Sequence, residues 1–106
     1  MRKLYRLTPD VAAALAAPGT VLFLVFPTGH MIRLDTLMRA ERFMQDMDRD
    51  RDYKLREMSG AEWWDTLPLG HRIDGGETFA FLVAQGVFPL EFACHPERSN
   101  KIYRRV

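Results

Sequence analysis

The run VLFLVF, residues 21–26, constrains the fold more than any other feature of this sequence. Every position in the run is apolar, so a β-strand formed by it would have to be covered on both faces. Pro-Thr-Gly follows at 27–29 and forms a turn, after which HMIRLD at 30–35 returns along the first strand. Two strands joined by so short a loop make a hairpin. The sequence therefore predicts a β-hairpin that must pack against other elements.

Helical patterns flank this hairpin on both sides. Thr8 followed by Pro9 is a typical helix start with Thr8 as the N-cap, and the alanine-rich segment after them ends at Pro18 and Gly19. From Thr36 onward apolar residues recur at steps of three and four, the period of an amphipathic helix. We therefore predict one helix before the hairpin and a second one after it.

The middle of the second half of the chain is harder to interpret. Ser59 and Glu62 have the spacing of a capping box, which predicts a short helix that ends before Pro68. Asp-Gly-Gly at 74–76 predicts a turn, because glycine adopts the positive φ angles that such turns need. Residues 77–86 are compatible with a strand or with a buried helix that has a glycine end-cap, and we favour the strand.

The two ends of the chain resemble charged edge strands. Residues 3–6 and 101–104 share the order Lys, aliphatic, Tyr, Arg, and charges of this kind discourage an edge strand from pairing with a second molecule. Residues 88–95 alternate apolar and polar side chains, which indicates a strand that pairs with 101–106. We predict an α+β fold for residues 1–106, a small single compact domain with a mainly antiparallel sheet, basic terminal strands at its edges, and two to three helices.

Composition and cysteine content narrow the class of protein. A chain of 106 residues with 47% apolar and 27% charged residues has the size and balance of one globular domain. It contains no run of about 18 apolar residues that could span a membrane, and its start lacks a secretory signal. Cys94 is the only cysteine, which excludes an internal disulfide. We therefore expect a cytoplasmic protein without a membrane partner.

The stretch DMDRDRDYKLRE, residues 46–57, places acidic residues at four ligand positions of an EF-hand calcium loop. Arg51 occupies the position that needs glycine, where its backbone strain would cost about 1–2 kcal/mol. Continued as a helix, the same stretch places acids four residues before bases, which is a favourable spacing. These pairs are Asp50 with Lys54 and Asp52 with Arg56. We favour the helix end and expect neither a metal nor a cofactor.

Catalytic residue types are present but are poorly arranged for catalysis. Cys94 and His95 are neighbours in a predicted strand, so their side chains point to opposite faces. His30 and His71 each follow a turn signal and lack the paired spacing of zinc ligands. IDGGETF, residues 73–79, lacks the lysine of a phosphate-binding loop. We predict that the protein is not an enzyme, and keep a small cysteine- or histidine-dependent enzyme as an alternative.

Basic residues gather at both ends of the chain, and most of the acidic residues lie between them. The net charge is only +1, so no overall field draws the protein to a polyanion. If the two ends meet, however, tyrosines could stack on bases while arginines bind phosphates. Nucleic-acid binding is therefore an alternative function. The residues concerned are Arg2, Lys3, Tyr5, Arg6, Lys101, Tyr103, Arg104 and Arg105.

Trp63 and Trp64 favour protein binding instead. Adjacent residues on a helix point about 100° apart, so one of these two rings should be partly exposed. Tryptophan and arginine are the residues most enriched at interface hot spots. The apolar strands of so small a chain would also be better covered by a partner or by a second copy in a homodimer.

The function that we predict is therefore that of a small non-enzymatic protein-binding module, namely an adaptor, an inhibitor or an assembly factor. Its binding residues would be Trp63, Trp64 and the basic and tyrosine residues of the two chain ends. Small proteins of viral or mobile-element origin have this profile, as do bacterial accessory proteins.

Overall fold

The computed structural model describes residues 4–94 and 100–106. It is an α+β fold with two small antiparallel sheets, which confirms the predicted class. The described residues form five helices and two sheets, where two to three helices and one main sheet were expected. The elements are α1 (Pro9–Ala16), β1 (Phe23–Val25), β2 (Met31–Arg33), α2 (Leu34–Gln45), β3 (Asp52–Tyr53), α3 (Leu55–Ser59), α4 (Ala61–Asp65), α5 (Leu69–Ala84), β4 (Leu90–Phe92) and β5 (Tyr103–Arg105).

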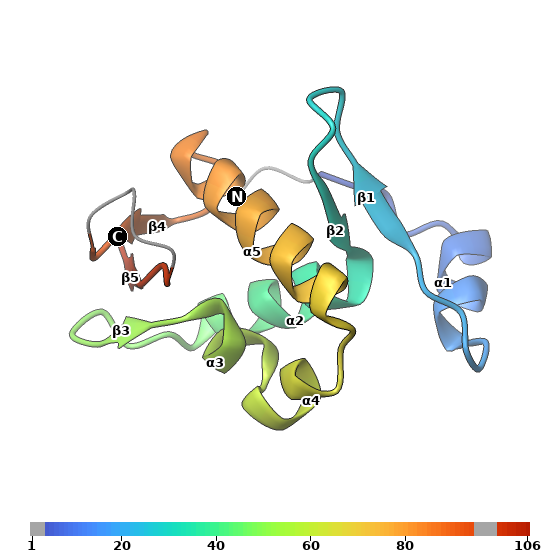
Figure 1. Cartoon of the computed structure of the whole chain (residues 1–106), viewed down its shortest axis with the longest axis horizontal. Coiled ribbons are helices and arrows are strands. Elements are labelled where there is room, and N and C mark those ends of the chain that lie inside the picture. Colours follow the sequence, from blue (N-terminus) through green and yellow to red (C-terminus); the bar gives the residue numbers. More distant parts are fainter. Residues whose placement is uncertain (1–3, 95–99) are drawn as a thin grey trace.

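The predicted hairpin is present as β1 and β2. The strands pair antiparallel from Phe23 opposite Arg33 to Val25 opposite Met31. Strand β2 packs along α5, and β1 lies on the outer side of the hairpin (Figure 1). The expectation that the first strand is covered on both faces is wrong, because Val25 remains 64% exposed. Helix α5 lies behind this two-stranded sheet and cannot cover both faces of the outer strand, β1.

Helix α5 runs straight through the predicted turn at 74–76 and the strand favoured at 77–86, so both predictions are wrong. Long-range contacts explain the difference. A Cβ built on Gly75 would lie 3.8 Å from the ring of Trp64, an ordinary van der Waals distance, so this part of α5 packs against Trp64. Thr78 donates a 2.7 Å hydrogen bond from its Oγ1 to the carbonyl of Met31, which ties α5 to β2.

The second sheet has the strand order β3-β5-β4. The predicted pairing of the two C-terminal strands is confirmed, with Phe92 opposite Tyr103. Strand β5 lies in the centre and is not an edge, which corrects the prediction of a basic edge at this end. Its second neighbour is β3, and Arg104 forms a 2.9 Å ion pair with Asp52 across that ladder. The described part of the N-terminal segment, residues 4–7, forms no strand.

The acidic stretch 46–57 does not continue α2, which ends at Gln45. A turn follows in which Asp48 Oδ1 accepts a 2.9 Å hydrogen bond from the backbone of Asp50. The predicted helical pairs of acids and bases are therefore wrong. Asp52 pairs instead with Arg104 in β5, and Arg56 pairs with Asp65 in α4.

The short helix expected after residue 59 is present as α4, and another short helix, α3, precedes it. Gly60, with φ at +97°, ends α3 and begins α4, a conformation that favours glycine. Ser59 is not an N-cap as predicted, because its hydroxyl is buried and donates a 2.8 Å hydrogen bond to the carbonyl of Leu55. The resulting bend between α3 and α4 sets the position of both tryptophans.

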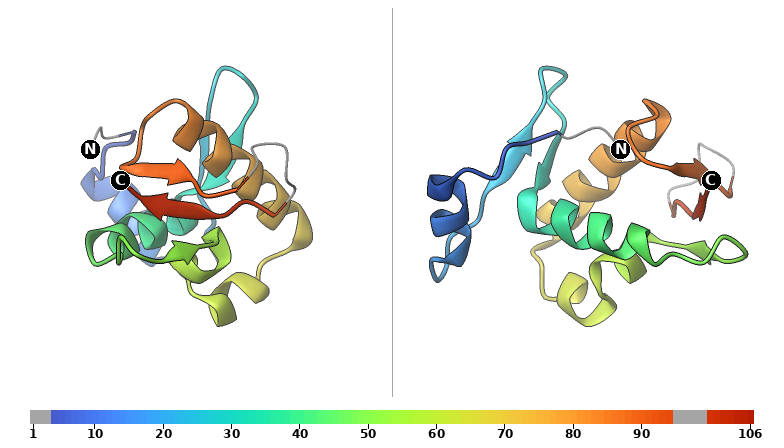
Figure 2. Two further views of the ribbon diagram at one scale, coloured as in Figure 1. Left: turned by 90° about the vertical axis from the view of Figure 1, so that its left-hand side faces the viewer. Right: turned by 180° about the vertical axis from the view of Figure 1, so that it is seen from behind.

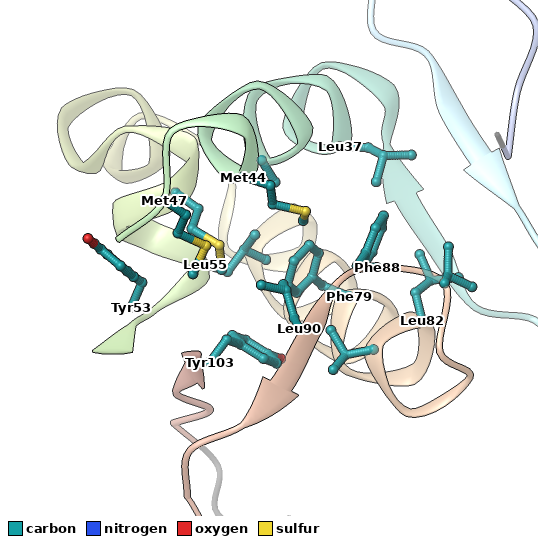
Figure 3. Close-up of a cluster of buried hydrophobic side chains, with 14 of the residues drawn as sticks. Leu37, Met44, Met47, Tyr53, Leu55, Phe79, Leu82, Phe88, Leu90 and Tyr103 are labelled. Carbon is teal, nitrogen blue, oxygen red and sulfur yellow. The ribbon is translucent and has the colours of Figure 1, made fainter. Parts of the chain in front are cut away.

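The hydrophobic core lies between α2, α5 and the second sheet. Phe79 of α5 is fully buried at its centre, and its ring centroid is 5.1 Å from those of Phe88 and Tyr103 (Figure 3). Met44 contributes from α2 to the same cluster. Helix α1 lies beyond β1, at the opposite end of the molecule from β5, and has no buried residue (Figure 2). Its predicted N-cap is confirmed, since Thr8 Oγ1 accepts a hydrogen bond from Val11.

Candidate functional site

Trp63 of α4 is held by two arginines. The guanidinium carbon of Arg39 lies 4.1 Å from the centroid of the indole ring, and that of Arg33 lies 5.7 Å from it. Arg39 also donates a 3.1 Å hydrogen bond to the carbonyl of Ser59. Arg33 makes two hydrogen bonds to the carboxylate of Asp35, at 3.0 and 2.7 Å, and its side chain is 11% exposed. Fixed donors and a stacked ring of this kind suit a preorganised binding surface.

Beside this cluster lies an open groove of about 750 Å³, which we call the α2 groove. Its base is the outer face of α2, where residues recur at helical spacing on the side away from the core. Helix α1 contributes one wall through Leu15, and α3 contributes the opposite wall. The lining residues are Leu15, Asp35, Met38, Arg39, Arg42, Phe43, Asp46, Glu57, Met58, Ser59 and Gly60.

Trp64 belongs to a different hollow, of about 680 Å³, which we call the Trp64 pocket. It lies between α3, α5 and the C-terminal residues, and brings together three of the predicted site residues, Trp64, Lys101 and Tyr103. Trp63 is not part of this lining and lies beside Arg39 instead, so the two adjacent tryptophans have different surroundings. The pocket is lined by Lys54, Leu55, Arg56, Trp64, Arg72, Ile73, Gly76, Glu77, Ala80, Asn100, Lys101 and Tyr103.

The terminal residues predicted to form one basic surface have separate environments. Tyr5 donates a 2.7 Å hydrogen bond from its hydroxyl to Glu41 of α2, and burial together with this carboxylate raises the pKa of Tyr5. Arg105 donates a hydrogen bond to the carbonyl of Met44, one turn further along the same helix. Arg6 is exposed. Arg2 and Lys3 lie outside the described residues.

The side chain of Tyr103 faces the core and not the solvent. The residue is 1% exposed, and burial raises the pKa of its hydroxyl group. Its ring lies edge-on to Phe79, and little of it is exposed for stacking on a base. Arg104 is exposed but is paired with Asp52, and this hydrogen bond raises the pKa of its guanidinium. Tyr5, Tyr103, Arg104 and Arg105 therefore each make contacts within the fold.

The residues of the enzyme alternative lie in separate parts of the structure. Cys94 accepts a 3.2 Å hydrogen bond from the backbone N–H of Ile102. His30 Nδ1 is 2.6 Å from Thr28 Oγ1 in the hairpin turn, and His71 Nδ1 is 3.2 Å from Arg33. His95 lies outside the described residues. Each described residue of the set thus makes its own local contact.

Acidic and histidine side chains do not converge on a metal position anywhere in residues 4–94 and 100–106. The former calcium candidate, 46–57, is a turn followed by β3 and α3. Over the same ranges no helix is long and apolar enough to cross a membrane.

Sequence reasoning did not identify the α2 groove. Met38, Arg39 and Arg42 all fall outside the apolar stripe of α2, and residues outside such a stripe are usually solvated. What makes them a site is the position of α1 and α3 on either side, which no local pattern contains. Only the exposure expected for a tryptophan at 63 or 64 pointed to this region.

Comparison with protein-family models, with curated proteins and with solved structures found no match for this chain.

Proposed function

We propose that this protein is a non-enzymatic protein-binding module, which docks on another protein by taking an amphipathic helical segment of that partner into the α2 groove. The observation that carries the proposal is the groove itself, about 750 Å³ in volume, with Leu15, Met38 and Phe43 in its lining. Helices that present apolar side chains at intervals of three and four residues commonly bind in such grooves. Adaptor, inhibitor and assembly roles all use this kind of contact.

The composition of the groove supports a protein partner. Methionine, aromatic residues and arginine are enriched at protein interfaces, and flexible methionine side chains adapt to the shape of a bound segment. Met38 and Phe43 are half-buried, which leaves part of each available for contact. Trp63, stacked on Arg39 at the rim, is the kind of residue that dominates interface energetics.

The charges at the rim distinguish a protein from a polyanion. Arg39 and Arg42 lie in the same lining as Asp35, Asp46 and Glu57. A strand of nucleic acid would meet these carboxylates, whose repulsion opposes binding. A helical segment that carries both acidic and basic side chains can match both signs.

Helix α1 gives a second reason to expect a partner here. None of its residues is buried, although every residue from 11 to 16 is alanine, valine or leucine. A bound segment would cover α1 on one side and α2 on the other. The single free thiol, Cys94, suits the reducing cytoplasm in which we place this interaction.

A photo-cross-linking amino acid at position 38 tests the proposal. The captured protein is then purified and titrated by calorimetry against the unmodified chain, Met38→Asp and Gln85→Asp. Gln85 is exposed at the end of α5 and lies outside the groove lining, so it is the matched control. We expect at least about tenfold weaker binding, near 1.4 kcal/mol, for Met38→Asp, and no change for Gln85→Asp.

Equal binding by both variants would contradict docking in the groove. Cross-links between two copies of this chain, with dimers in light scattering, would replace the foreign partner with a homodimer. Capture of nucleic acid by position 38 would favour the nucleic-acid alternative.

A further inference from the structure

We propose that the Trp64 pocket is a binding site for a small organic anion, a molecule that joins a carboxylate or phosphate group to a planar apolar body. The site is separate from the α2 groove and does not depend on the proposed protein docking. Its volume of about 680 Å³ falls in the range of roughly 300–1,000 Å³ that is typical of small-molecule sites.

The charge of the lining favours an anion. Four basic residues contribute to the pocket, and the one acidic residue in its lining is Glu77. Arg56 is neutralised by its 2.7 Å ion pair with Asp65, which lies outside the lining. Lys54 and Arg72 by themselves still outnumber Glu77 in the lining, so the pocket has an excess of positive charge. The four basic residues are Lys54, Arg56, Arg72 and Lys101.

Arg72 has an unsatisfied donor in this wall. Its Nε is buried and has no hydrogen-bond partner, a condition shared by few buried polar atoms in folded proteins. Nε itself is closed to solvent, so a carboxylate or phosphate in the pocket would meet the guanidinium at its terminal N–H groups, through charge-assisted hydrogen bonds. Arg72 lies in the second turn of α5 and is therefore held by a rigid element.

Gly76 leaves space where the helix would otherwise carry a side chain. Glycine is less favourable than alanine inside a helix. A Cβ on Gly75 would make an ordinary van der Waals contact, 3.8 Å from the ring of Trp64. A Cβ on Gly76 would have no atom within 4 Å, and Gly76 lines the pocket. We infer that the missing side chain leaves room for a ligand.

The apolar part of the wall defines the rest of the ligand. Leu55, Trp64 and Ala80 line the pocket together with the basic residues. A planar ring against these residues would bury apolar surface while its acidic group reaches the bases. An indole is a good surface for a flat ring, because aromatic rings prefer offset-stacked or edge-to-face contacts.

The probes are adenosine 5′-monophosphate and 4-phenylbutyrate, which separate a phosphate ligand from a carboxylate ligand. Fluorescence is recorded in the Trp63→Phe chain, so that emission reports Trp64 alone, and calorimetry is performed on the unmodified chain. We expect saturable binding of at least one probe. Adenosine lacks the phosphate group and inorganic phosphate lacks the planar ring, so each should bind at least about tenfold more weakly.

Matched variants locate the site. Arg72→Gln and Gly76→Leu should each weaken binding of the probe by at least about tenfold. Arg42→Gln, in the α2 groove, and Gly70→Leu, in the same helix with open space around it, should leave binding unchanged. If Arg72→Gln does not fold, Lys101→Gln replaces it, and circular dichroism confirms the fold of every variant.

Failure of both probes to saturate would overturn the proposal, as would binding by Gly76→Leu equal to that of the unmodified chain. Single-stranded DNA that binds more tightly than either probe, with the same dependence on Arg72, would replace the small anion with a polynucleotide. Met38→Asp should leave probe binding intact, so this site and the α2 groove can fail separately.

Discussion

Helix α1 has a larger share of apolar residues than helix α5, six of eight against eight of sixteen, and the two helices use them in different ways. Phe79 of α5 is fully enclosed by rings from β5 and from the segment before β4, whereas α1 has no buried residue at all. We call the region around α5 the core and the segment from α1 to β1, residues 9–25, the arm. The comparison shows that apolar content alone does not identify a stabilising element. The core maintains the fold, and the arm presents apolar surface for contact with something else.

The largest expected effect is that of emptying the core. Phe79→Ala should lower the free energy of unfolding by about 3–5 kcal/mol, because it removes a buried ring and leaves a cavity. Leu15→Ala in the arm should change it by less than about 0.5 kcal/mol. Urea unfolding followed by circular dichroism measures both. Comparable losses for the two variants would remove the distinction between core and arm.

Two glycines with positive φ sharpen the comparison. Alanine at Gly60, where φ is +97°, should cost about 1–2 kcal/mol, because the strained backbone sits between two helices that pack on the core. Gly19, with φ at +75°, connects α1 to β1 in the arm, where local opening can relieve the same strain. Gly19→Ala should therefore affect global unfolding less. Equal midpoints in urea for the two variants would show that the arm and the core unfold together.

Alkaline pH should act on the core through Tyr103. Because burial raises the folded-state pKa of Tyr103, the folded protein keeps this proton when the unfolded chain loses it. The corresponding stability is fully present below the ordinary tyrosine pKa of about 10 and is lost progressively at higher pH. The free energy of unfolding of Tyr103→Phe should therefore decline less than that of the unmodified chain between about pH 9.5 and 11. If the free energy of unfolding fell equally with pH in Tyr103→Phe and in the unmodified chain, this role of Tyr103 would be contradicted.

The smallest effect is expected at the start of the arm. Thr8→Ala removes the side chain that accepts a hydrogen bond from Val11, which should weaken α1 by about 0.5–1 kcal/mol. Because α1 contributes little to the core, the midpoint of global unfolding should barely move. Amide exchange within Pro9–Ala16 should become faster. A clear shift of the global midpoint would mean that α1 is coupled to the core.

Local signals were enough to predict part of the fold. The Thr8 cap, the turn at 27–29 and the alternation at 88–95 each act over a few residues, and the structure contains the corresponding helix start, hairpin and strand. Helix α5 was missed because Gly75 and Gly76 within it are a strong turn signal. What outweighs that signal is contact with Trp64 and Met31, which are distant in sequence.

The candidate sites, too, could be predicted from the sequence only in part. Exposure of a tryptophan at 63 or 64 follows from helix geometry, but the different surroundings of the two rings, Trp63 beside Arg39 and Trp64 in its pocket, depend on the bend at Gly60. The burial of Tyr103 was not predicted, because a sequence pattern cannot show which strand becomes central in a sheet. Both hollows are lined by at least three elements, so neither could be recognised from one segment.

The division into core and arm is tested most directly by native-state hydrogen exchange, with residue-level protection compared between α1 and α5. The account predicts that the amides of α5 around Phe79 exchange only through global unfolding, while those of Pro9–Ala16 exchange through local opening at a much lower free energy. Protection in α1 equal to that in α5 would contradict it, because the arm would then be part of the cooperative core.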